Sequence, residues 1–539
     1  MKKTIVSLVV FLMLVMPLTA GGSKDSGATT TAGNSQAVAV KPANWKESDA
    51  TKSFSYHVGS AIVSLDKWVA TSNNTIQAIE YCIFDPILSR DEDGNLIPWL
   101  AKDWKFTDDF MAVTFYLRDD VYFTNGTKFT ADDLIFTFER LRDDTTHYAA
   151  ASVRNWRPYL GTLTKNGDYE VTLNLNMKMP EFSYLIIDPA IGVICKSAYE
   201  SMDYDTFWRK PIGTGAYVVE SWDSANNICK MTLRSDPNGY WGYKAYGTYT
   251  NVKNLTVQYS PEGQTRISSL RSGEVQMIED IPTTSKATLE RDGFITQAMR
   301  PVNLTFLQTA SARGDAFDNQ KLREALSLCI DRELIVESLL SGFAIPCTEP
   351  CRPGDLGYTG VQNIFYNPER AKQLVAESGY DGRPLNFIFT TSVVNIGNEL
   401  SQAIQSMAAS VGINLRINML EVAVYDQDRL AHQFDLVLSN IADSGNYWFK
   451  IGNNVIGQDR FNTGFQNARL KQLGLDLGDA LDPNEADKIY KEMYSIETKE
   501  FAPNIYLYFP TRVHSWVRNA TGMRFHGAQI PNLHAVVLN

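Results

Sequence analysis

The stretch Leu385–Met419, LNFIFTTSVVNIGNELSQAIQSMAASVGINLRINM, decides the fold class. Leu385, Phe387 and Phe389 stand at alternate positions at its start, which predicts a strand. Apolar residues then recur every three or four positions up to Gly412, which predicts a helix that ends there. Alternation returns up to Met419, and another apolar run, Phe434–Leu438, follows. This order predicts an α/β fold with a mainly parallel sheet covered by helices in this region.

In a second stretch, Ala112–Leu141, the spacing of apolar residues also changes from that of a strand to that of a helix. Alternating apolar residues up to Phe123 predict a pair of half-buried strands, and Asn125–Gly126 favours a tight turn. Thr130 and Asp133 then stand three apart, as in a capping box, ahead of apolar residues at helical spacing. The stretch therefore predicts strands that lead through a turn into a helix. The apolar spacing of 318–342 likewise predicts one or two helices.

Length and composition bound the class of protein. The chain has 539 residues, too many for one compact core, so several lobes are expected. It is 44% hydrophobic and 21% charged, which is ordinary globular composition. With 50 Lys and Arg against 61 Asp and Glu, and no polybasic run, it is not expected to bind nucleic acid.

The first twenty residues predict export. Lys2 and Lys3 precede the uncharged stretch 4–20, as in a signal peptide, and Pro17 makes a permanent membrane anchor the weaker alternative. Gly21 stands where a lipoprotein box needs its lipid-carrying Cys, so soluble release and retention by an uncleaved signal both stay open. Residues 21–40 are mostly Gly, Ala, Ser and Thr, which is typical of a flexible linker.

Sequence motifs for chemistry are scarce. The common signatures of hydrolases, zinc proteases and NTPases are absent from the sequence. Gly213–Gly215 resembles the start of a dinucleotide loop, but the third glycine is missing and β-like sequence follows, so a packing turn is predicted. Asp91–Asn95 lacks the full ligand pattern of a calcium loop and is interpreted as an exposed turn. No cofactor and no metal are expected, and the protein is not expected to be an enzyme.

Cysteines and histidines give no metal motif either. Cys347 and Cys351 have no His or second Cys pair nearby in sequence, so a disulfide or two unpaired thiols are both expected alternatives. The six histidines are scattered singly, which favours structural or solvated roles.

One long segment carries a family resemblance. Residues 84–140, FDPILSRDEDGNLIPWLAKDWKFTDDFMAVTFYLRDDVYFTNGTKFTADDLIFTFER, are similar to the signature region of bacterial extracellular solute-binding protein family 5. These are the substrate-binding proteins of ABC importers of the oligopeptide, dipeptide and nickel class. Further matching segments follow in the family's order, at 211–217, 270–275, 322–326 with 330–332, 366–372 with 378–380, and 404–405 with 411–413.

The resemblance implies a two-lobed periplasmic-binding-protein fold of type II, the Venus-flytrap fold, with an inserted subdomain. The implied division is a signal peptide at 1–20, a linker at 21–50, lobe I at 51–85, 206–300 and 503–539, the inserted subdomain at 86–205, and lobe II at 301–502. Crossing strands are expected near Asn303–Thr309 and Pro503–Pro510.

The resemblance also implies a function. The protein is expected to be a monomer that captures a peptide-like solute by hinge closure and delivers it to an integral-membrane ABC permease. An oligosaccharide or another neutral solute, or a metal chelate, are the alternatives within the fold. An exported hydrolase is the alternative of a different class.

Candidate ligand-binding residues are carried over from the family by position. Asp443 falls close to the place of an aspartate that pairs with the ligand's amino group in peptide-binding relatives. Dipeptide-selective relatives place an arginine after the strand 385–391, where this sequence has Ser392–Asn395, so a strict dipeptide binder is disfavoured. The predicted ligand-binding residues are Asp443, Tyr447, Trp448, Asn440, Ser72, Asn73, Gln308, Thr391, Asn395 and Trp68.

Overall fold

The computed structural model describes most of the chain after residue 40. The described residues are 41–66, 69, 74–90, 96–148, 157, 159–176, 192–299, 301, 303–312, 314–352, 355–360, 365–442, 463–480, 483–526 and 530–539. The chain divides into two units, Met1–Ala37 and Val38–Asn539, and all described residues belong to the second. The predicted signal peptide, linker residues 21–40 and the turn Asp91–Asn95 lie outside the described residues. Among the described helices, none is long and apolar enough to cross a membrane.

The largest sheet has seven strands in the order β12-β19-β11-β1-β10-β9-β8. β1 runs parallel to β10 and β11, and the other neighbouring pairs are antiparallel. Its strands come from distant parts of the chain: β1 (Lys52–Val58), β8 (Tyr217–Asp223), β9 (Ile228–Leu233), β10 (Val252–Tyr259), β11 (Met277–Ile278), β12 (Ile295–Ala298) and β19 (Val513–Trp516). Helices α1 (Asn74–Ile83), α8 (Gly263–Ser272) and α9 (Lys286–Arg291) belong to the same region.

A four-stranded antiparallel sheet, in the order β4-β5-β7-β6, is inserted between β1 and β8 in the chain. Its strands are β4 (Ala101–Phe106), β5 (Ala112–Leu117), β6 (Leu160–Gly167) and β7 (Glu170–Leu175). Helix α2 (Ala131–Asp143) begins where expected, because Asp133 Oδ2 accepts a hydrogen bond from the backbone nitrogen of Thr130 over 3.0 Å. Gly126 has a φ of 85°, which confirms the predicted turn. The predicted strand, turn and helix are all present.

The third sheet has six strands in the order β14-β18-β13-β17-β15-β16. They are β13 (Asn303–Thr309), β14 (Ala344–Pro346), β15 (Leu385–Phe389), β16 (Leu415–Met419), β17 (Leu436–Ala442) and β18 (Asn504–Pro510). β15 is parallel to β16 and β17, but β17, β13, β18 and β14 pair antiparallel. The expectation of a mainly parallel sheet in the region 385–438 is therefore confirmed for β15, β16 and β17, whereas β13, β14 and β18, which come from outside this region, add antiparallel pairs. The reason is that the chain enters the region along β13 and leaves it along β18, so these two strands run in opposite directions.

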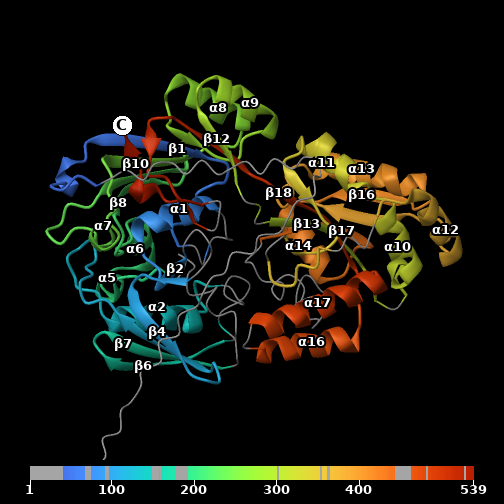
Figure 1. Ribbon diagram of the computed structural model, residues 1–539, viewed down its shortest axis with the longest axis horizontal. Helices are drawn as coiled ribbons and strands as arrows, with labels where there is room; N and C mark the ends of the chain where they lie inside the picture. Colours follow the sequence, from blue (N-terminus) through green and yellow to red (C-terminus); the bar gives the residue numbers. More distant parts are fainter. Residues whose placement is uncertain are drawn as a thin grey trace, which may run out of the picture. The chain divides into compact units, whose positions relative to one another are not determined.

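Helices flank the six-stranded sheet and meet its apolar residues. Leu400 and Ile404 of α13 and Leu322 and Leu326 of α10 share one buried cluster with Leu385 and Phe387 of the sheet. Figure 1 shows α16 and α17 side by side. The helices of this region are α10 (Gln320–Leu328), α11 (Arg332–Leu340), α12 (Pro368–Ser378), α13 (Gly397–Ser410), α14 (Val422–Leu430), α16 (Ala468–Asp479) and α17 (Pro483–Glu500).

Shorter elements complete the described fold. The helices are η1 (Glu47–Asp49), α5 (Lys196–Glu200), α6 (Tyr204–Arg209), α7 (Trp241–Ala245), η3 (Thr283–Ser285), η4 (Ala316–Asp318) and η6 (Leu533–Ala535). The strands are β2 (Leu88–Arg90), β3 (Leu96–Pro98), β20 (Ala520–Thr521), β21 (Phe525–His526), β22 (Ile530–Pro531) and β23 (Val537–Leu538).

Two crossovers join the seven-stranded and six-stranded sheets. The first crossover, residues 299–302, connects β12 to β13, and the second, Thr511–Arg512, connects β18 to β19. Met299 N donates to Arg512 O over 2.8 Å, so the two crossovers are hydrogen-bonded to each other. The strands β13 and β18 thus lie where crossing strands were expected.

Gly213–Gly215 forms a packing turn. Gly215 N donates to Ile83 O over 2.8 Å, and a Cβ on Gly213 would lie 2.1 Å from the same oxygen. The chain then continues into β8 rather than into a helix. The glycines are required by the close approach of two backbones, as predicted.

Candidate functional site

Three parallel strands end at one edge of the six-stranded sheet. β15 pairs with β16 and β17 in parallel, with Phe389 opposite Met419 and Ile388 opposite Val437. In open α/β sheets, ligands bind outside the carboxyl ends of parallel strands. We call this end the carboxyl edge. Continuing the register brings two of the predicted residues, Thr391 and Asn440, to the same level of this edge.

Neutral amides form a hydrogen-bonded chain at the carboxyl edge. Asn303 Nδ2 donates to Asn440 Oδ1 over 3.0 Å, and Asn440 Nδ2 donates to Thr305 Oγ1 over 3.1 Å. Both asparagines are half-buried, whereas Thr305 is 1% exposed. An asparagine amide can make four hydrogen bonds, so the pair Asn303–Asn440 has further donor and acceptor capacity. Sequence reasoning missed Asn303, whose only signal was its place at the start of the expected crossing strand.

The tyrosine beside the amide chain is neutral as well. Tyr508 of β18 lies opposite Thr305 in the ladder and is buried. Burial raises the pKa of the Tyr508 hydroxyl, so this group stays neutral at any physiological pH. The amide chain and its neighbour therefore offer hydrogen bonds without a charge.

Two predicted residues in the segment that follows β15, Thr391 and Asn395, are exposed. Thr391 and Asn395 both lie in the turn between β15 and α13. Asn395 Oδ1 accepts from the backbone nitrogen of Ile396 over 2.9 Å, which leaves its amide nitrogen pointing away from that bond. Residues 390–398 contain no charged residue. A ligand carboxylate would find no cation in this segment.

Gln308 lies at the other end of β13, opposite Val437. Its side chain is buried, accepts from Arg429 Nη2 over 2.8 Å and donates to Asn504 Oδ1 over 3.2 Å. The structure therefore does not bring Gln308 together with Asn440. Its contacts tie β13 to α14 and β18, and its role in ligand binding stays a prediction.

Six predicted residues lie outside the described residues: Asp443, Tyr447, Trp448, Trp68, Ser72 and Asn73. Asp443 directly follows the last residue of β17, so in the sequence it continues from the carboxyl edge. Their roles stay predictions.

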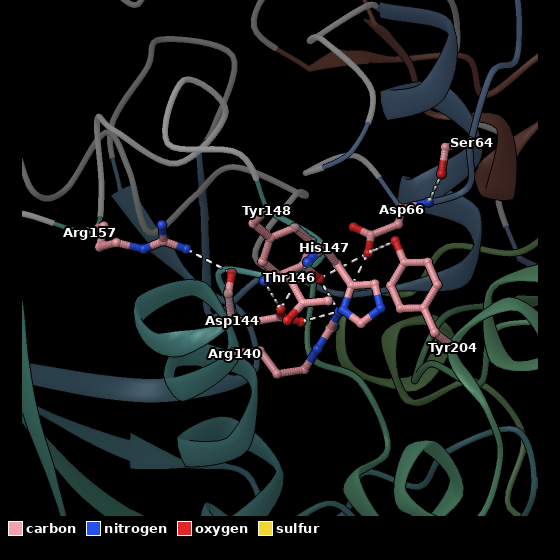
Figure 2. A network of polar contacts seen from close by, with 9 residues as sticks. All are labelled: Ser64, Asp66, Arg140, Asp144, Thr146, His147, Tyr148, Arg157 and Tyr204. Carbon is pink, nitrogen blue, oxygen red and sulfur yellow. Dashed lines mark hydrogen bonds and ion pairs between the residues drawn. The ribbon is translucent and has the colours of Figure 1, made fainter.

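A buried carboxylate precedes the segment that contains Trp68, Ser72 and Asn73. Asp66 is fully buried, and its Oδ2 accepts from Tyr148 Oη and Tyr204 Oη, each over 2.9 Å. Arg140 Nη2 lies 3.4 Å from the same oxygen. Figure 2 shows these side chains converging on Asp66 from α2, from the residues after it and from α6. We call Asp66, Arg140, Tyr148 and Tyr204 the Asp66 cluster.

The charge of the Asp66 cluster is balanced internally. Burial, and then the Asp66 carboxylate, raise the pKa of the Tyr148 and Tyr204 hydroxyls, so both remain donors. The cation of Arg140 offsets the carboxylate. A buried carboxylate with three donors is stable in this form.

Cys347 and Cys351 are both buried. Cys351 Sγ lies 2.6 Å from Tyr494 Oη. Among the described residues, no group of three His, Cys, Asp or Glu side chains is placed to hold a metal ion.

Comparison with known families decides what this architecture is. Residues 95–448 match the family described as bacterial extracellular solute-binding proteins, family 5, middle part. The chain belongs to this family. Family 5 proteins are substrate-binding proteins that act outside the cytoplasm with ABC transporters, and they are not enzymes, in agreement with the sequence analysis.

Similar proteins fix the fold of this family 5 protein. The glutathione-binding protein GsiB of Salmonella typhi is 25% identical over 490 residues, which cover 86% of this chain and 90% of that protein. The dipeptide-binding protein of Pseudoalteromonas sp. SM9913, in complex with Met-Leu, has a TM-score of 0.77 at 21% identity and covers 90% of this chain and 100% of its own. The oligopeptide-binding protein AppA of Bacillus subtilis, in complex with a nonapeptide, has a TM-score of 0.73 at 20% identity and covers 91% and 100%. The predicted type II periplasmic-binding-protein fold is confirmed.

Proposed function

We propose that this family 5 protein captures a peptide-like solute at the carboxyl edge and delivers it to an integral-membrane ABC permease. The observation that carries the proposal is the neutral amide chain of Asn303, Asn440 and Thr305. It stands at the edge where the chain also crosses between the two sheets. A ligand held there would contact the segments that any hinge motion must move.

Hinge closure provides the mechanism. The predicted division places 51–85, 206–300 and 503–539 in lobe I, 86–205 in its inserted subdomain and 301–502 in lobe II. A ligand that touches both lobes only in the closed form shifts the hinge equilibrium toward that form. The ligand can shift the equilibrium between the open and the closed form only by as much as its binding free energy differs between the two forms. The closed shape, rather than a chemical product, is what the permease would recognise.

The chemistry of the edge selects the class of solute. A peptide backbone offers one donor and one acceptor at each residue, and the amides of Asn303 and Asn440 complement both. Because residues 390–398 carry no cation, a short peptide's carboxylate would lose a charge-assisted bond of about 1.5–3 kcal/mol there. A longer peptide held through its backbone fits this segment better than a dipeptide.

A neutral solute such as an oligosaccharide is the second candidate. The observation that favours it is the same neutral amide chain, because sugar hydroxyls also pair with amide donors and acceptors. The two candidates differ in what Asp443 does. A peptide's amino group would pair with that carboxylate, whereas a neutral sugar would not need it.

The location of the protein follows from its first residues. We propose that the chain is exported, acts as a monomer and does not bind nucleic acid. Gly21 in place of a lipid-carrying Cys leaves soluble release or an uncleaved signal as the two modes.

A binding screen tests the proposal. Purified protein is heated with glutathione, Met-Leu, a tetrapeptide, a nonapeptide, maltotriose and nickel–histidine, and each mixture is then examined by mass spectrometry. A peptide that raises the melting temperature and is recovered unaltered supports the proposal. A shift with maltotriose alone supports the neutral solute, a shift with nickel–histidine alone would establish a chelate binder, and cleavage of any compound would establish a hydrolase.

A further inference from the structure

Arg352 occupies a buried position between the first crossover and the end of β18. Its Nη1 donates to the carbonyl oxygen of Pro301 in the first crossover. Its Cζ lies 5.7 Å from the ring centroid of Phe509, the residue before the end of β18. The Arg352 side chain is 7% exposed. One cation therefore contacts the first crossover and the end of the strand that leads into the second crossover.

Asp355 orients this cation. Arg352 Nε lies 2.9 Å from Asp355 Oδ2 and Arg352 Nη2 lies 3.2 Å from Asp355 Oδ1, so the pair is bidentate. Asp355 Oδ2 also accepts from the backbone nitrogen of Arg352 over 3.0 Å. A bidentate pair fixes the plane of the guanidinium. This plane directs Nη1 at Pro301.

The turn that carries Asp355 is attached to α17. Gly357 N donates to Asp487 Oδ1 of α17 over 2.8 Å. Gly357 has a φ of 81°, and a Cβ there would lie 2.6 Å from Cβ of Tyr490, so only glycine permits this contact. Arg352 is thereby held from a helix of the six-stranded region while its guanidinium contacts a crossover.

The residues before Arg352 follow the second crossover. Thr511 N donates to Phe343 O over 3.0 Å, and β14 pairs with the last residues of β18. Cys347 N then donates to Leu507 O over 3.1 Å. Residues 343–347 therefore lie along β18, and Arg352, which follows them, contacts the first crossover.

We propose that Arg352, oriented by Asp355, is a hinge-positioning residue that sets the resting angle between the two sheets. We call Arg352, Asp355, Pro301 and Phe509 the hinge brace. The inference rests on the proposed function because it assumes that the crossovers bend during ligand capture. A change of the angle between β12 and β13 moves the Pro301 carbonyl, so the brace favours the hinge conformation in which the carbonyl meets Nη1. Without the brace, the ligand-free protein samples other angles.

The test uses the ligand-free full-length protein. Spin labels on p-acetylphenylalanine replace the exposed Lys230 on β9 and Lys372 on α12, so that the buried cysteines are left unchanged. Because removing one partner of a buried pair leaves a costly orphan charge, the main variant is Arg352→Met with Asp355→Asn. The amide oxygen that Asp355→Asn introduces still offers an acceptor to the backbone nitrogen at position 352. Arg352→Lys keeps the charge but removes the fork, and serves as the second variant.

The double variant is expected to shift and broaden the distance distribution between the labels. The amide of Met299 should exchange with deuterium about tenfold faster, since the hydrogen bond to Arg512 loses its support. Arg352→Lys should show the same changes to a smaller extent, and it carries the test if the double variant fails to fold. The matched control is Arg469→Met with Glu492→Gln, which removes a bidentate pair between α16 and α17 that does not touch the crossovers.

Unchanged distances and unchanged exchange in a folded Arg352 variant would overturn the inference. A change of the same size in the Arg469 control would do so as well. Since no ligand is added, this outcome leaves the proposed capture of a solute untouched. Conversely, if no peptide binds, the distances between the labels in the ligand-free protein still test the role of Arg352.

Discussion

Asn303 donates a hydrogen bond to Asn440 over 3.0 Å and so joins the first crossing strand to the carboxyl edge of the parallel strands. The two residues are 137 positions apart in the sequence. The pairing puts a hydrogen-bonding group of the candidate site directly on a strand that leads into the hinge. Ligand contact and hinge geometry are therefore coupled through one amide pair.

Removing the amide of Asn440 should weaken ligand binding. Asn440→Leu keeps the size of the side chain but loses its donor and acceptor, and leaves Asn303 and Thr305 without their present partner. We expect affinity for the best peptide of the screen to fall about tenfold to a hundredfold. Isothermal titration calorimetry measures this change. Asn386→Leu, on β15 at the amino end of the same sheet, is the control and should bind as the wild type does.

The Asp66 cluster should matter for stability. Asp66→Asn removes the charge that Arg140 offsets and one acceptor used by two tyrosines. Because a buried cation is then left unpaired, the free energy of unfolding should fall by about 3–5 kcal/mol. Urea titration measures this loss. Asp120→Asn, in an exposed pair with Arg118, should cost less than about 1 kcal/mol. Equal losses in the two variants would contradict the role assigned to the cluster.

His534 should make the protein less stable in acid. It is buried, its Nδ1 lies 3.2 Å from Tyr81 O, and burial lowers its pKa from 6.5 to about 4. Between these two values the unfolded chain binds a proton that the folded one does not, so stability rises with pH and is lost as pH falls from 6.5 to 4. The shift corresponds to about 3 kcal/mol across that window. His534→Gln should flatten this part of the curve of unfolding free energy against pH, and an unchanged slope would argue against burial of His534 as the cause.

The packing turn should not tolerate a side chain at Gly213. Gly213→Ala would place a Cβ 2.1 Å from Ile83 O, so α1 and β8 would have to separate. We expect a loss of about 1–3 kcal/mol in the free energy of unfolding. Gly167→Ala is the control, because no atom lies within 4 Å of its Cβ position and its φ is not positive. Thermal unfolding of both variants decides whether the turn is needed for packing.

Local elements of the fold could be predicted well from the sequence. Periodicity located β15, α13 and β16, and the pair Thr130 and Asp133 located the start of α2, because these features depend on neighbouring residues. The antiparallel half of the six-stranded sheet could not be predicted in this way. Its pairing depends on β13 and β18, which are almost 200 residues apart and whose apolar runs do not show direction.

The candidate site was predictable only in part. Asn440 and Thr391 followed from positions in the family resemblance, and the strand register brings them to one edge. Asn303 and the hinge brace were not found, since a lone Asn or Arg has no periodic signal and its partner lies far away in sequence. Gln308 was predicted from its place on a crossing strand, but it lies at the other end of β13 from Thr305, which pairs with Asn440. A place on a crossing strand does not tell which end of the strand a side chain occupies.

The central claim is that two lobes close over a solute that leaves unaltered. The most direct measurement is the distance between labels at positions 230 and 372 in the otherwise wild-type protein, titrated with the peptide that gives the largest thermal shift. The account predicts that a second, distinct distance population grows with peptide concentration, saturates with the binding curve and disappears when the peptide is dialysed away. A distance distribution that stays the same at saturating peptide would contradict it.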